Sequence, residues 1–360
     1  MGKGKVRVNY DISKYQRQTS LRSFGTDKQQ KLLQSKVLII GLGGLGVPVA
    51  QYLNAMGIGT LGLMDGDTIA IHNLHRQVLY AEKDIGKRKV DVAAQKLKAQ
   101  NYDTHIVAIP SFLKIENALK IIKGYDVVVD ATDNFETRYL INDACVILSR
   151  PFVYGALHDF EGQVSVFNYQ DGPTYRCLFP NMPKPEEIPN CDAHGVLGIL
   201  PGIIGSLQAL EVVKVLTKIG EVLSGKLLLF DGLSQENRFM RFQTNPKNKT
   251  ISTLATSYGV PLCAAEIQVE WEVFLKKHAS EQLVDVRSSK EFQYSHLDNT
   301  VNIPLSELED SLDQINLKET IYFVCQSGKR SLQAVEKLKM LSPNTVSYSL
   351  KGGMNEMVIT

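Results

Sequence analysis

The sequence predicts an α/β protein with two domains. Residues 37–65 follow a strand–helix–strand pattern with glycines before the helix, which is typical of a βαβ unit. A second series of alternating strands and helices begins near residue 282, after a polar stretch. The chain has 360 residues. It therefore exceeds the size at which single hydrophobic cores usually stop growing, about 250–300 residues.

The first series contains apolar runs without polar alternation, as expected of parallel strands covered on both faces. We expect strands at Val37–Ile40, Thr60–Met64 and Asp126–Asp130, and a helix that ends near Met56. Polar residues follow these strands, and parallel sheets bind ligands at the carboxyl ends of their strands. The pattern predicts a Rossmann-like domain with a mostly parallel sheet.

After this series the pattern changes twice. Three prolines within Asn181–Asn190 predict a long surface loop, and the apolar run from about Leu200 to Leu216 predicts a helix. The residues around Thr244–Lys249 are polar, which indicates that the domain ends nearby. We expect a first domain over residues 10–250, a linker over 251–265, and a smaller α/β domain over 266–360.

The second domain shows the same alternation on a smaller scale. We expect strands at Gln282–Val286 and Ile321–Val324, then a loop that contains a cysteine, and a helix from about Ser331. Apolar residues recur every three positions in that helix, so that one face packs on the sheet: Leu332, Val335, Leu338 and Leu341.

Composition excludes several classes of protein. The net charge is +2, which does not favour a polyanionic partner such as nucleic acid. Apolar runs fall short of the roughly 18 residues of a membrane span, and no signal peptide is recognisable. The five cysteines are few and odd in number, which favours reduced thiols and a cytoplasmic location.

A glycine-rich turn follows the first strand. Gly41, Gly43 and Gly46 match the G-x-G-x-x-G pattern, and Asp65 ends the next strand. Such glycines let the backbone approach phosphates, the helix N-terminus favours anions, and an acidic residue can accept from ribose hydroxyls. The pattern predicts a nucleotide or dinucleotide site. The alternative is a tight turn that close packing requires.

Charged residues downstream favour a triphosphate. Arg76 and Lys89 follow Asp65, and fixed cations suit the charge of a triphosphate better than that of a pyrophosphate bridge. The alternative is that both are solvated surface charges. Asp133 and Asn134 end another buried strand, where oxygen ligands could hold Mg²⁺ or cap a helix, and the two roles are compatible.

Several motifs occur in the order found in one known protein family. Lys14–Gln18, Gly41–Gly46, Asn73–Gln77, Asp130–Asn134 with Arg138, and Cys191 before Gly195–Gly198 together resemble the MoeB/ThiF family of sulfur-carrier adenylyltransferases. The resemblance covers about residues 10–245. It implies that ATP and Mg²⁺ are bound and that the C-terminal Gly-Gly carboxylate of a small ubiquitin-like carrier protein is adenylated. This carboxylate is already ionised at neutral pH and needs no general base.

The resemblance also implies roles for individual residues. The glycine loop and the charged residues would bind ATP, and Asp133 would also lie near Mg²⁺. Arg17 would reach into the site of the partner subunit, which implies a homodimer, and Cys191 would be the thiol of a catalytic loop. The expected ATP-binding residues are Gly41, Gly43, Gly44, Gly46, Asp65, Asn73, Arg76, Lys89, Asp133 and Asn134.

One family feature is missing. Relatives of this type usually hold a structural zinc with two C-x-x-C pairs, but the first pair is reduced here to Thr174–Cys177, and Phe239–Thr253 contains no cysteine. Tetrahedral zinc needs about four N or S ligands. We expect no zinc site, and Cys177 to be a structural remnant.

The second cysteine motif is Cys325-Gln-Ser-Gly-Lys-Arg330-Ser331. In a loop before a helix, we expect backbone N–H groups, Arg330 and the helix N-terminus to face the sulfur and stabilise a thiolate or persulfide. A structural cysteine at the end of a strand and a tyrosine-phosphatase loop are the alternatives. The loop is one residue shorter than phosphatase-type loops of this fold.

Residues 266–360 resemble a rhodanese domain. The motifs are Asp285–Ser288, Glu291-Phe292, His296, Val301–Leu305 and Gly352-Gly353. Met357 stands where an aromatic residue is common, and few residues follow Gly353, so the last helix of the domain could be shortened or absent. The resemblance implies that Cys325 and Arg330 form a sulfurtransferase site.

Together the two resemblances imply one reaction sequence. The first domain would adenylate the carrier, and a persulfide on Cys325, loaded by a donor such as a cysteine desulfurase, would convert it to a thiocarboxylate. Molybdopterin biosynthesis is the expected pathway, with thiamine biosynthesis and tRNA thiolation as alternatives. An NAD-dependent oxidoreductase and a non-catalytic scaffold are more distant alternatives.

Overall fold

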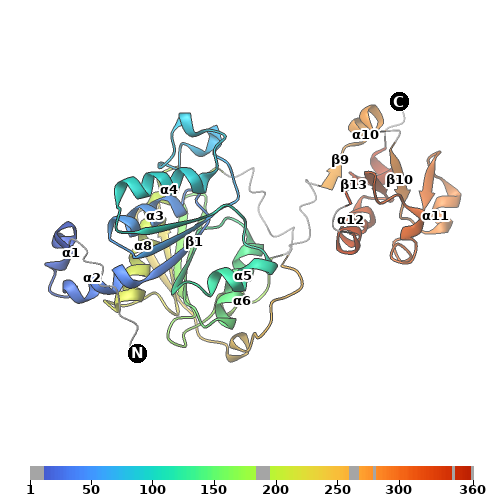
Figure 1. Cartoon of the computed structure of the whole chain (residues 1–360). Coiled ribbons are helices and arrows are strands. Elements are labelled where there is room, and N and C mark those ends of the chain that lie inside the picture. Colours follow the sequence, from blue (N-terminus) through green and yellow to red (C-terminus); the bar gives the residue numbers. More distant parts are fainter. Residues whose placement is uncertain (1–11, 184–194, 259–266, 279–280, 343–344, 358–360) are drawn as a thin grey trace, which may run out of the picture. The chain divides into compact units, whose positions relative to one another are not determined.

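The computed structural model describes residues 12–183, 195–258, 267–278, 281–342 and 345–357. These residues form two compact units (Figure 1), the first from 12–182 with 195–258 and the second from 267–357. Each unit has its own sheet and hydrophobic core. The predicted α/β class is confirmed.

The first unit is built on an eight-stranded sheet with the strand order β3-β2-β1-β4-β5-β6-β7-β8. The neighbouring strands from β3 to β5 are parallel, whereas β6, β7 and β8 each run antiparallel to the strand before them. Parallel neighbours need long crossover connections, and the helices of this unit supply them. The strands are β1 Lys36–Ile40, β2 Thr60–Met64, β3 His105–Ile109, β4 Val127–Asp130, β5 Phe152–His158, β6 Glu161–Phe167, β7 Lys226–Asp231 and β8 Asn237–Arg241.

Helices cover both faces of the parallel part of this sheet. They are α1 Gln16–Thr19, α2 Gly25–Gln34, α3 Gly46–Ala55, α4 Lys89–Gln100, α5 Ile115–Ile122, α6 Phe135–Ile147, α7 Tyr175–Leu178 and α8 Leu200–Thr217. Short 3-10 turns lie at Ile12–Tyr15, Ile71–Asn73, Glu82–Asp84 and Pro246–Lys249. By length and composition α8 alone among the described helices could cross a membrane, but it is mostly buried, as a core helix is.

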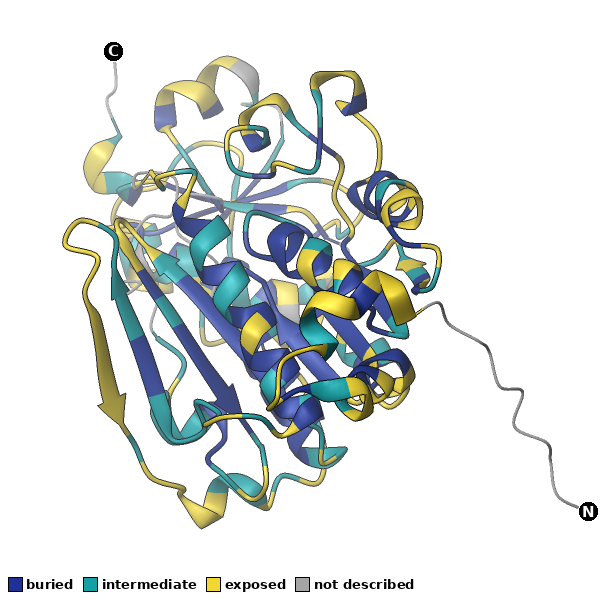
Figure 2. Ribbon diagram, turned by 90° about the vertical axis from the view of Figure 1, so that its left-hand side faces the viewer, coloured by how far each residue is buried: buried dark blue, intermediate teal, exposed yellow. Residues whose placement is uncertain are grey.

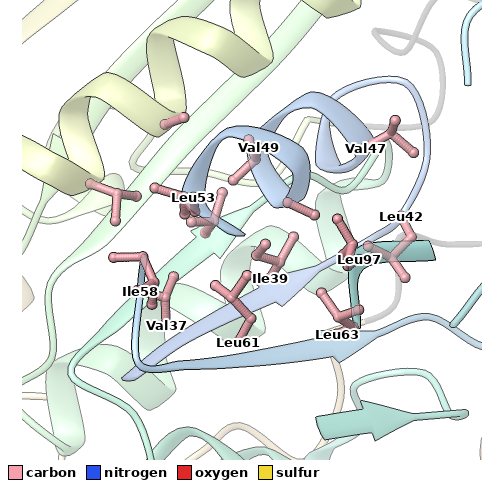
Figure 3. Close-up of a cluster of buried hydrophobic side chains, with 14 of the residues drawn as sticks. Val37, Ile39, Leu42, Val47, Val49, Leu53, Ile58, Leu61, Leu63 and Leu97 are labelled. Carbon is pink, nitrogen blue, oxygen red and sulfur yellow. The ribbon is translucent and has the colours of Figure 1, made fainter. Parts of the chain in front are cut away.

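The central strand β1 explains why the sequence shows a continuous apolar run. Val37 and Ile39 pack with residues of α3, α4 and α8 on one face (Figure 3), while Leu38 and Ile40 pack with α5 and α6 on the other. All four side chains are buried, so truncating one to alanine would cost about 2–5 kcal/mol. At the far edge of the sheet, β8 is exposed along its length (Figure 2).

The second unit has a five-stranded, all-parallel sheet with the order β11-β10-β12-β13-β9. Its elements are β9 Gln268–Val269, α10 Trp271–Lys277, β10 Gln282–Asp285, α11 Ser289–Tyr294, β11 Thr300–Asn302, the 3-10 turn Leu312–Gln314, β12 Ile321–Val324, α12 Lys329–Leu341, β13 Ser347–Leu350 and the 3-10 turn η7, Gly353–Glu356. The helix α12 starts two residues before the expected Ser331. Val335 and Leu338 are buried as predicted, whereas Leu341 is 38% exposed.

The expected linker, 251–265, begins inside the first unit. Tyr258 is buried, and its hydroxyl donates to Asp143 Oδ2 at 2.8 Å. The same carboxylate accepts two hydrogen bonds from Arg176. The segment that leaves the first unit is therefore fixed to α6 up to Tyr258.

Candidate functional site

The glycine loop joins β1 to α3, and three of its glycines are required by packing. One is Gly44, where a Cβ would lie 2.8 Å from Pro201 Cβ. Gly41 has φ +93°, and a Cβ there would lie 2.5 Å from the carbonyl oxygen of Ala131. A Cβ on Gly46 would lie 1.8 Å from the carbonyl oxygen of Gly41. Gly43 is different, because a Cβ would only make an ordinary contact, 3.6 Å from the Gln77 amide nitrogen. Packing among the described residues does not explain Gly43.

The loop presents unused backbone donors. The N–H groups of Gly43, Gly44 and Leu45 have no hydrogen-bond acceptor among the described residues. They precede α3, where the helix dipole also favours negative charge. Three free donors at a helix N-terminus form the arrangement that binds phosphate oxygens in nucleotide sites.

Asp65 lies beneath this loop and is buried. Its Oδ2 accepts from the Leu42 N–H at 2.7 Å and its Oδ1 from the Asp67 N–H at 2.8 Å. Each carboxylate oxygen keeps a second lone pair, so Asp65 can still accept from ribose hydroxyls. Tyr80 supports the loop from the other side, with its hydroxyl donating to the Leu42 carbonyl at 3.0 Å. Burial, and secondarily the Asp65 carboxylate, raises the pKa of Tyr80.

The two predicted cations lie near this loop in different settings. The stem of Arg76 packs beside Gly44, where a Cβ would lie 3.5 Å from Arg76 Cγ, and its guanidinium donates to the His72 carbonyl at 2.8 Å. Lys89 is buried and forms an ion pair with Asp67 at 2.8 Å. Lys89 is therefore not a solvated surface charge.

Asn73 shapes the turn that carries Arg76. Its side-chain oxygen accepts from the Ala70 N–H at 3.1 Å, and its carbonyl accepts from the N–H groups of Arg76 and Gln77. The side chain of Asn73 is buried. It thus holds the β2–α4 connection in the conformation that brings Arg76 to the glycine loop.

At the end of β4, Asp133 and Asn134 are both exposed. Asn134 caps α6, because its side-chain oxygen accepts from the Thr137 N–H at 2.9 Å. The capping role is therefore occupied, and Asp133 is left facing solvent beside the glycine loop, since Gly41 packs against Ala131. A carboxylate in this place fits a Mg²⁺ ion bound together with phosphates.

A buried ion pair underlies this strand end. Asp130 Oδ2 and Arg138 Nε are 3.9 Å apart, and Arg138 also donates to the Thr132 carbonyl at 2.9 Å. Burial raises the pKa of Asp130, and the Arg138 charge partly opposes that shift. Both side chains hold Thr132, the residue before Asp133. From the sequence alone this pair had no role beyond the motif in which both residues occur.

Arg17 lies away from this cluster. It is exposed in α1, and the side chain of its neighbour Gln18 donates to the Met56 carbonyl at 3.1 Å. Met56 caps the C-terminal end of α3, whereas the glycine loop is at the N-terminal end. The helix between them has 10 residues and so spans about 15 Å. Arg17 is therefore remote from the glycine loop of its own chain.

Cys191 lies outside the described residues, whereas the positions of the missing zinc ligands lie within them. Cys177 Sγ accepts from the N–H groups of Thr174 at 3.4 Å and Asn245 at 3.3 Å, and from the Asn248 side chain at 3.6 Å. Partial burial opposes ionisation, but these hydrogen bonds outweigh it and lower the pKa of Cys177. Two turns with the spacing of C-x-x-C pairs thus meet around one sulfur.

We expect purified protein to contain far less than one zinc per chain, because only Cys177 among these four positions is a thiol and tetrahedral zinc needs about four N or S ligands. The described residues include no group of three or more His, Cys, Asp or Glu side chains that could hold a metal ion. Elemental analysis after dialysis measures the zinc content, and stoichiometric zinc would contradict the expectation.

A designed variant provides the positive control for that measurement. The triple substitution Thr174→Cys, Asn245→Cys and Asn248→Cys should bind about one zinc per chain, because it completes a tetrad around Cys177. The comparison shows whether the zinc assay can detect a site at this position.

In the second unit, Cys325 directly follows β12 and is fully buried. It packs in the same core cluster as Ile321 and Phe323, since alternate residues of a strand share a face. Its Sγ lies 3.5 Å from Ser331 Oγ, its hydrogen-bond partner among the described residues. We expected backbone N–H groups to surround the sulfur, but among the described residues no backbone N–H donates to Cys325 Sγ. The strand direction turns this side chain inward, toward the core.

The loop after Cys325 is clamped by the last turn of the described chain. The carbonyl of Cys325 accepts from the Met354 N–H at 2.8 Å, and that of Gln326 from the Asn355 N–H at 3.0 Å. A Cβ on Gly353 would lie 2.1 Å from the Cys325 carbonyl oxygen, which explains the glycine. The turn η7 therefore supports the loop from the C-terminal side.

Arg330 is held by the carboxylate of Glu291, a residue of one of the quoted motifs to which the sequence assigned no partner. Its guanidinium makes two hydrogen bonds with Glu291, at 2.6 and 2.8 Å. Glu291 also accepts from Ser288, which caps α11. The Glu291 carboxylate, and to a lesser degree negative charge at Cys325, raises the pKa of Arg330. The hydrogen bond from Arg330 is the main cause that lowers the pKa of Glu291.

A second ion pair supports the other side of this loop. Asp285 and Arg287 are both buried and lie 2.7 Å apart. Arg287 also donates to the Gln326 side chain at 3.1 Å. The end of β10 is thereby connected to the residue after Cys325. The sequence contains these residues in a recognised motif, but their partner in the loop is 39 positions away.

Comparison with known proteins assigns both units. The ThiF family matches residues 15–253, and the rhodanese-like domain matches residues 271–359. Proteins described as adenylyltransferase and sulfurtransferase MOCS3 are similar over most of the chain. The protein from Drosophila grimshawi is 39% identical, covering 96% of this chain and 84% of that protein. The protein from Arabidopsis thaliana is 37% identical, covering 91% and 79% respectively.

Solved structures share the fold of the first unit. E. coli MccB with ATP has a TM-score of 0.58 at 24% identity, covering 70% of this chain and 76% of that chain. E. coli MccB with MccA-N7isoASN has a TM-score of 0.59 at 23% identity, covering 68% of this chain and 75% of that chain. At this identity the similarity establishes the fold alone.

Proposed function

This chain belongs to the ThiF family and carries a rhodanese-like domain, which makes it an adenylyltransferase with a sulfurtransferase domain, and we propose that it adenylates and then sulfurates a small carrier protein. The carrier ends in Gly-Gly, and ATP and Mg²⁺ are the co-substrates. The glycine loop carries this proposal most directly, since three free N–H groups and the nearby Arg76 and Lys89 suit a triphosphate.

In the first step the carrier carboxylate attacks the α-phosphorus of ATP, which yields an acyl-adenylate and pyrophosphate. The residues of this chain position the reactants and neutralise charge rather than move protons, because the carboxylate is already ionised. Gly41, Gly43, Gly44 and Gly46 with Asn73 would shape the ATP site, Asp65 would bind ribose, and Asp133 would share Mg²⁺ with the phosphates, beside Asn134. Arg76 and Lys89 would stabilise the leaving pyrophosphate.

In the second step the terminal sulfur of a Cys325 persulfide attacks the acyl carbon and AMP leaves, so that carrier and Cys325 are joined through an acyl disulfide. A thiolate, for which we propose Cys191, then attacks the Cys325 sulfur. This releases the carrier thiocarboxylate and leaves a Cys191–Cys325 disulfide, which a cellular thiol reduces. A cysteine desulfurase is the proposed persulfide donor, and the molybdenum cofactor is the proposed destination, with thiamine or tRNA thiolation as alternatives.

We also propose that the enzyme is a homodimer in which Arg17 completes the site of the partner subunit, because Arg17 is remote from the glycine loop of its own chain. Arg17→Ala and Arg76→Ala should each lose carrier-dependent ATP–pyrophosphate exchange. Mixing the two variants should restore part of the activity, since mixed dimers contain one intact site.

Exchange of subunits must be shown in the same mixture, for example with two different affinity tags. The absence of rescue in verified mixed dimers would contradict the role of Arg17 across the interface. Arg22→Ala provides a matched control, because Arg22 is also an exposed arginine of the N-terminal segment. This variant should retain exchange without being mixed with a second variant.

A further inference from the structure

Beyond the loop motif, two buried serines link Cys325 to the neighbouring strand. Ser331 Oγ lies 3.5 Å from Cys325 Sγ and 2.8 Å from Ser349 Oγ on β13. Both serines are fully buried. Among the described residues, the side chain of Ser349 has Ser331 as its hydrogen-bond partner. The contact that the Ser349 hydroxyl makes there is therefore the one with Ser331.

Counting protons assigns a direction to these hydrogen bonds. Ser331 Oγ donates to the Gly328 carbonyl at 3.0 Å, and a hydroxyl has a single proton. With a neutral thiol, Cys325 and Ser349 must therefore both donate to Ser331 Oγ. When the sulfur is an anion it can only accept, so the Ser331 proton must turn from the Gly328 carbonyl to the sulfur. Ser349 donates to Ser331 in both states.

We propose that Ser349 is a positioning residue that stabilises the anionic form of Cys325 through Ser331. Its donated hydrogen bond keeps Ser331 Oγ in place while the Ser331 proton turns, and it polarises the Ser331 hydroxyl as a donor. The proposal rests on the role of Cys325 as the sulfur-carrying nucleophile. It adds a residue 24 positions beyond Cys325, on a strand that the loop motif does not include.

Several charged groups also surround the loop and would influence ionisation of the sulfur. The described ones are Asp285 at the end of β10 and Arg287 after it, Glu291 on α11, Arg330 on α12, and Lys351 and Glu356 around η7. Substitution of Ser349 leaves all of them in place. A change in the pH dependence of Cys325 alkylation would therefore be due to loss of the hydrogen bond between Ser331 and Ser349.

The test is the rate at which iodoacetamide alkylates Cys325 between about pH 5 and pH 10. The full-length protein is used without ATP or carrier, and alkylation is measured by mass spectrometry of the peptide that contains Cys325. Ser349→Ala should slow alkylation at neutral pH about three- to tenfold and move the pH midpoint upward by about half to one unit, the effect of losing one hydrogen bond. Ser331→Ala should act in the same direction.

Ser347→Ala is the matched control, because Ser347 is buried two residues earlier on the same strand and shares its face. It should keep the wild-type midpoint, and Ser349→Thr, which retains the hydroxyl, should stay close to it. Equal midpoints for Ser349→Ala and Ser347→Ala would overturn the proposal. Because no carrier is present, that result would leave the proposed overall reaction untouched.

Discussion

Arg76→Ala and Lys89→Met should each reduce carrier-dependent ATP–pyrophosphate exchange by at least about a hundredfold, the scale of losing one oriented electrostatic contact in a transition state. Arg76 packs beside Gly44, and Lys89 is held by Asp67, which is hydrogen-bonded to Asp65 beneath the same loop. Arg76 is therefore positioned beside the loop whose N–H groups we assign to phosphates, and Lys89 is connected to that loop through Asp67 and Asp65.

The Lys89 substitution needs a control for stability. Lys89 is buried, so the methionine variant keeps the stem of the side chain and removes only the charge. Lys83→Ala, an exposed lysine of the same connection, should exchange at the wild-type rate. Near-normal exchange in both Arg76→Ala and Lys89→Met would refute the assignment of the triphosphate site.

Cys325→Ala should abolish sulfurtransferase activity with thiosulfate and cyanide while leaving pyrophosphate exchange almost unchanged. Adenylation uses a carboxylate nucleophile and needs no thiol, whereas sulfur transfer requires a sulfur atom that carries the persulfide. The two reactions also use residues of different units, since Cys325 belongs to the second unit and the glycine loop to the first.

Exchange serves as the internal control of this variant, because it shows that the first unit remains folded and active. Truncation of Cys325 removes a buried side chain, so the thermal unfolding of the second unit should be recorded as well. Sulfur transfer that persists in a folded Cys325→Ala protein would mean that another thiol carries the sulfur.

The sequence predicted the local elements around both sites closely. The strands β2 and β12 have the expected bounds, because each is an apolar run that polar or turn-forming residues interrupt on both sides. The glycine loop was predicted from a different local signal, because the turn between β1 and α3 requires particular residues at fixed spacing. The structure adds that packing among the described residues accounts for Gly41, Gly44 and Gly46 but not for Gly43.

Contacts between distant positions could not be predicted in this way. Tyr80, Glu291 and Ser349 each support a functional loop through one hydrogen bond or ion pair that depends on which strands are neighbours. Periodicity does not specify strand order. The buried position of Cys325 was missed for a related reason, because the motif gives the residues of the loop but not the face to which the strand turns the sulfur.

In the proposed function, one chain both activates the carrier and supplies its sulfur. The most direct measurement is the mass of a Gly-Gly carrier after incubation with ATP, Mg²⁺, a persulfide donor and either wild-type protein or Cys325→Ala. With wild-type protein the carrier should gain the mass difference of one oxygen replaced by one sulfur. With Cys325→Ala it should yield the acyl-adenylate or unchanged carrier, and thiocarboxylate formed at the wild-type rate would contradict the proposed role of Cys325.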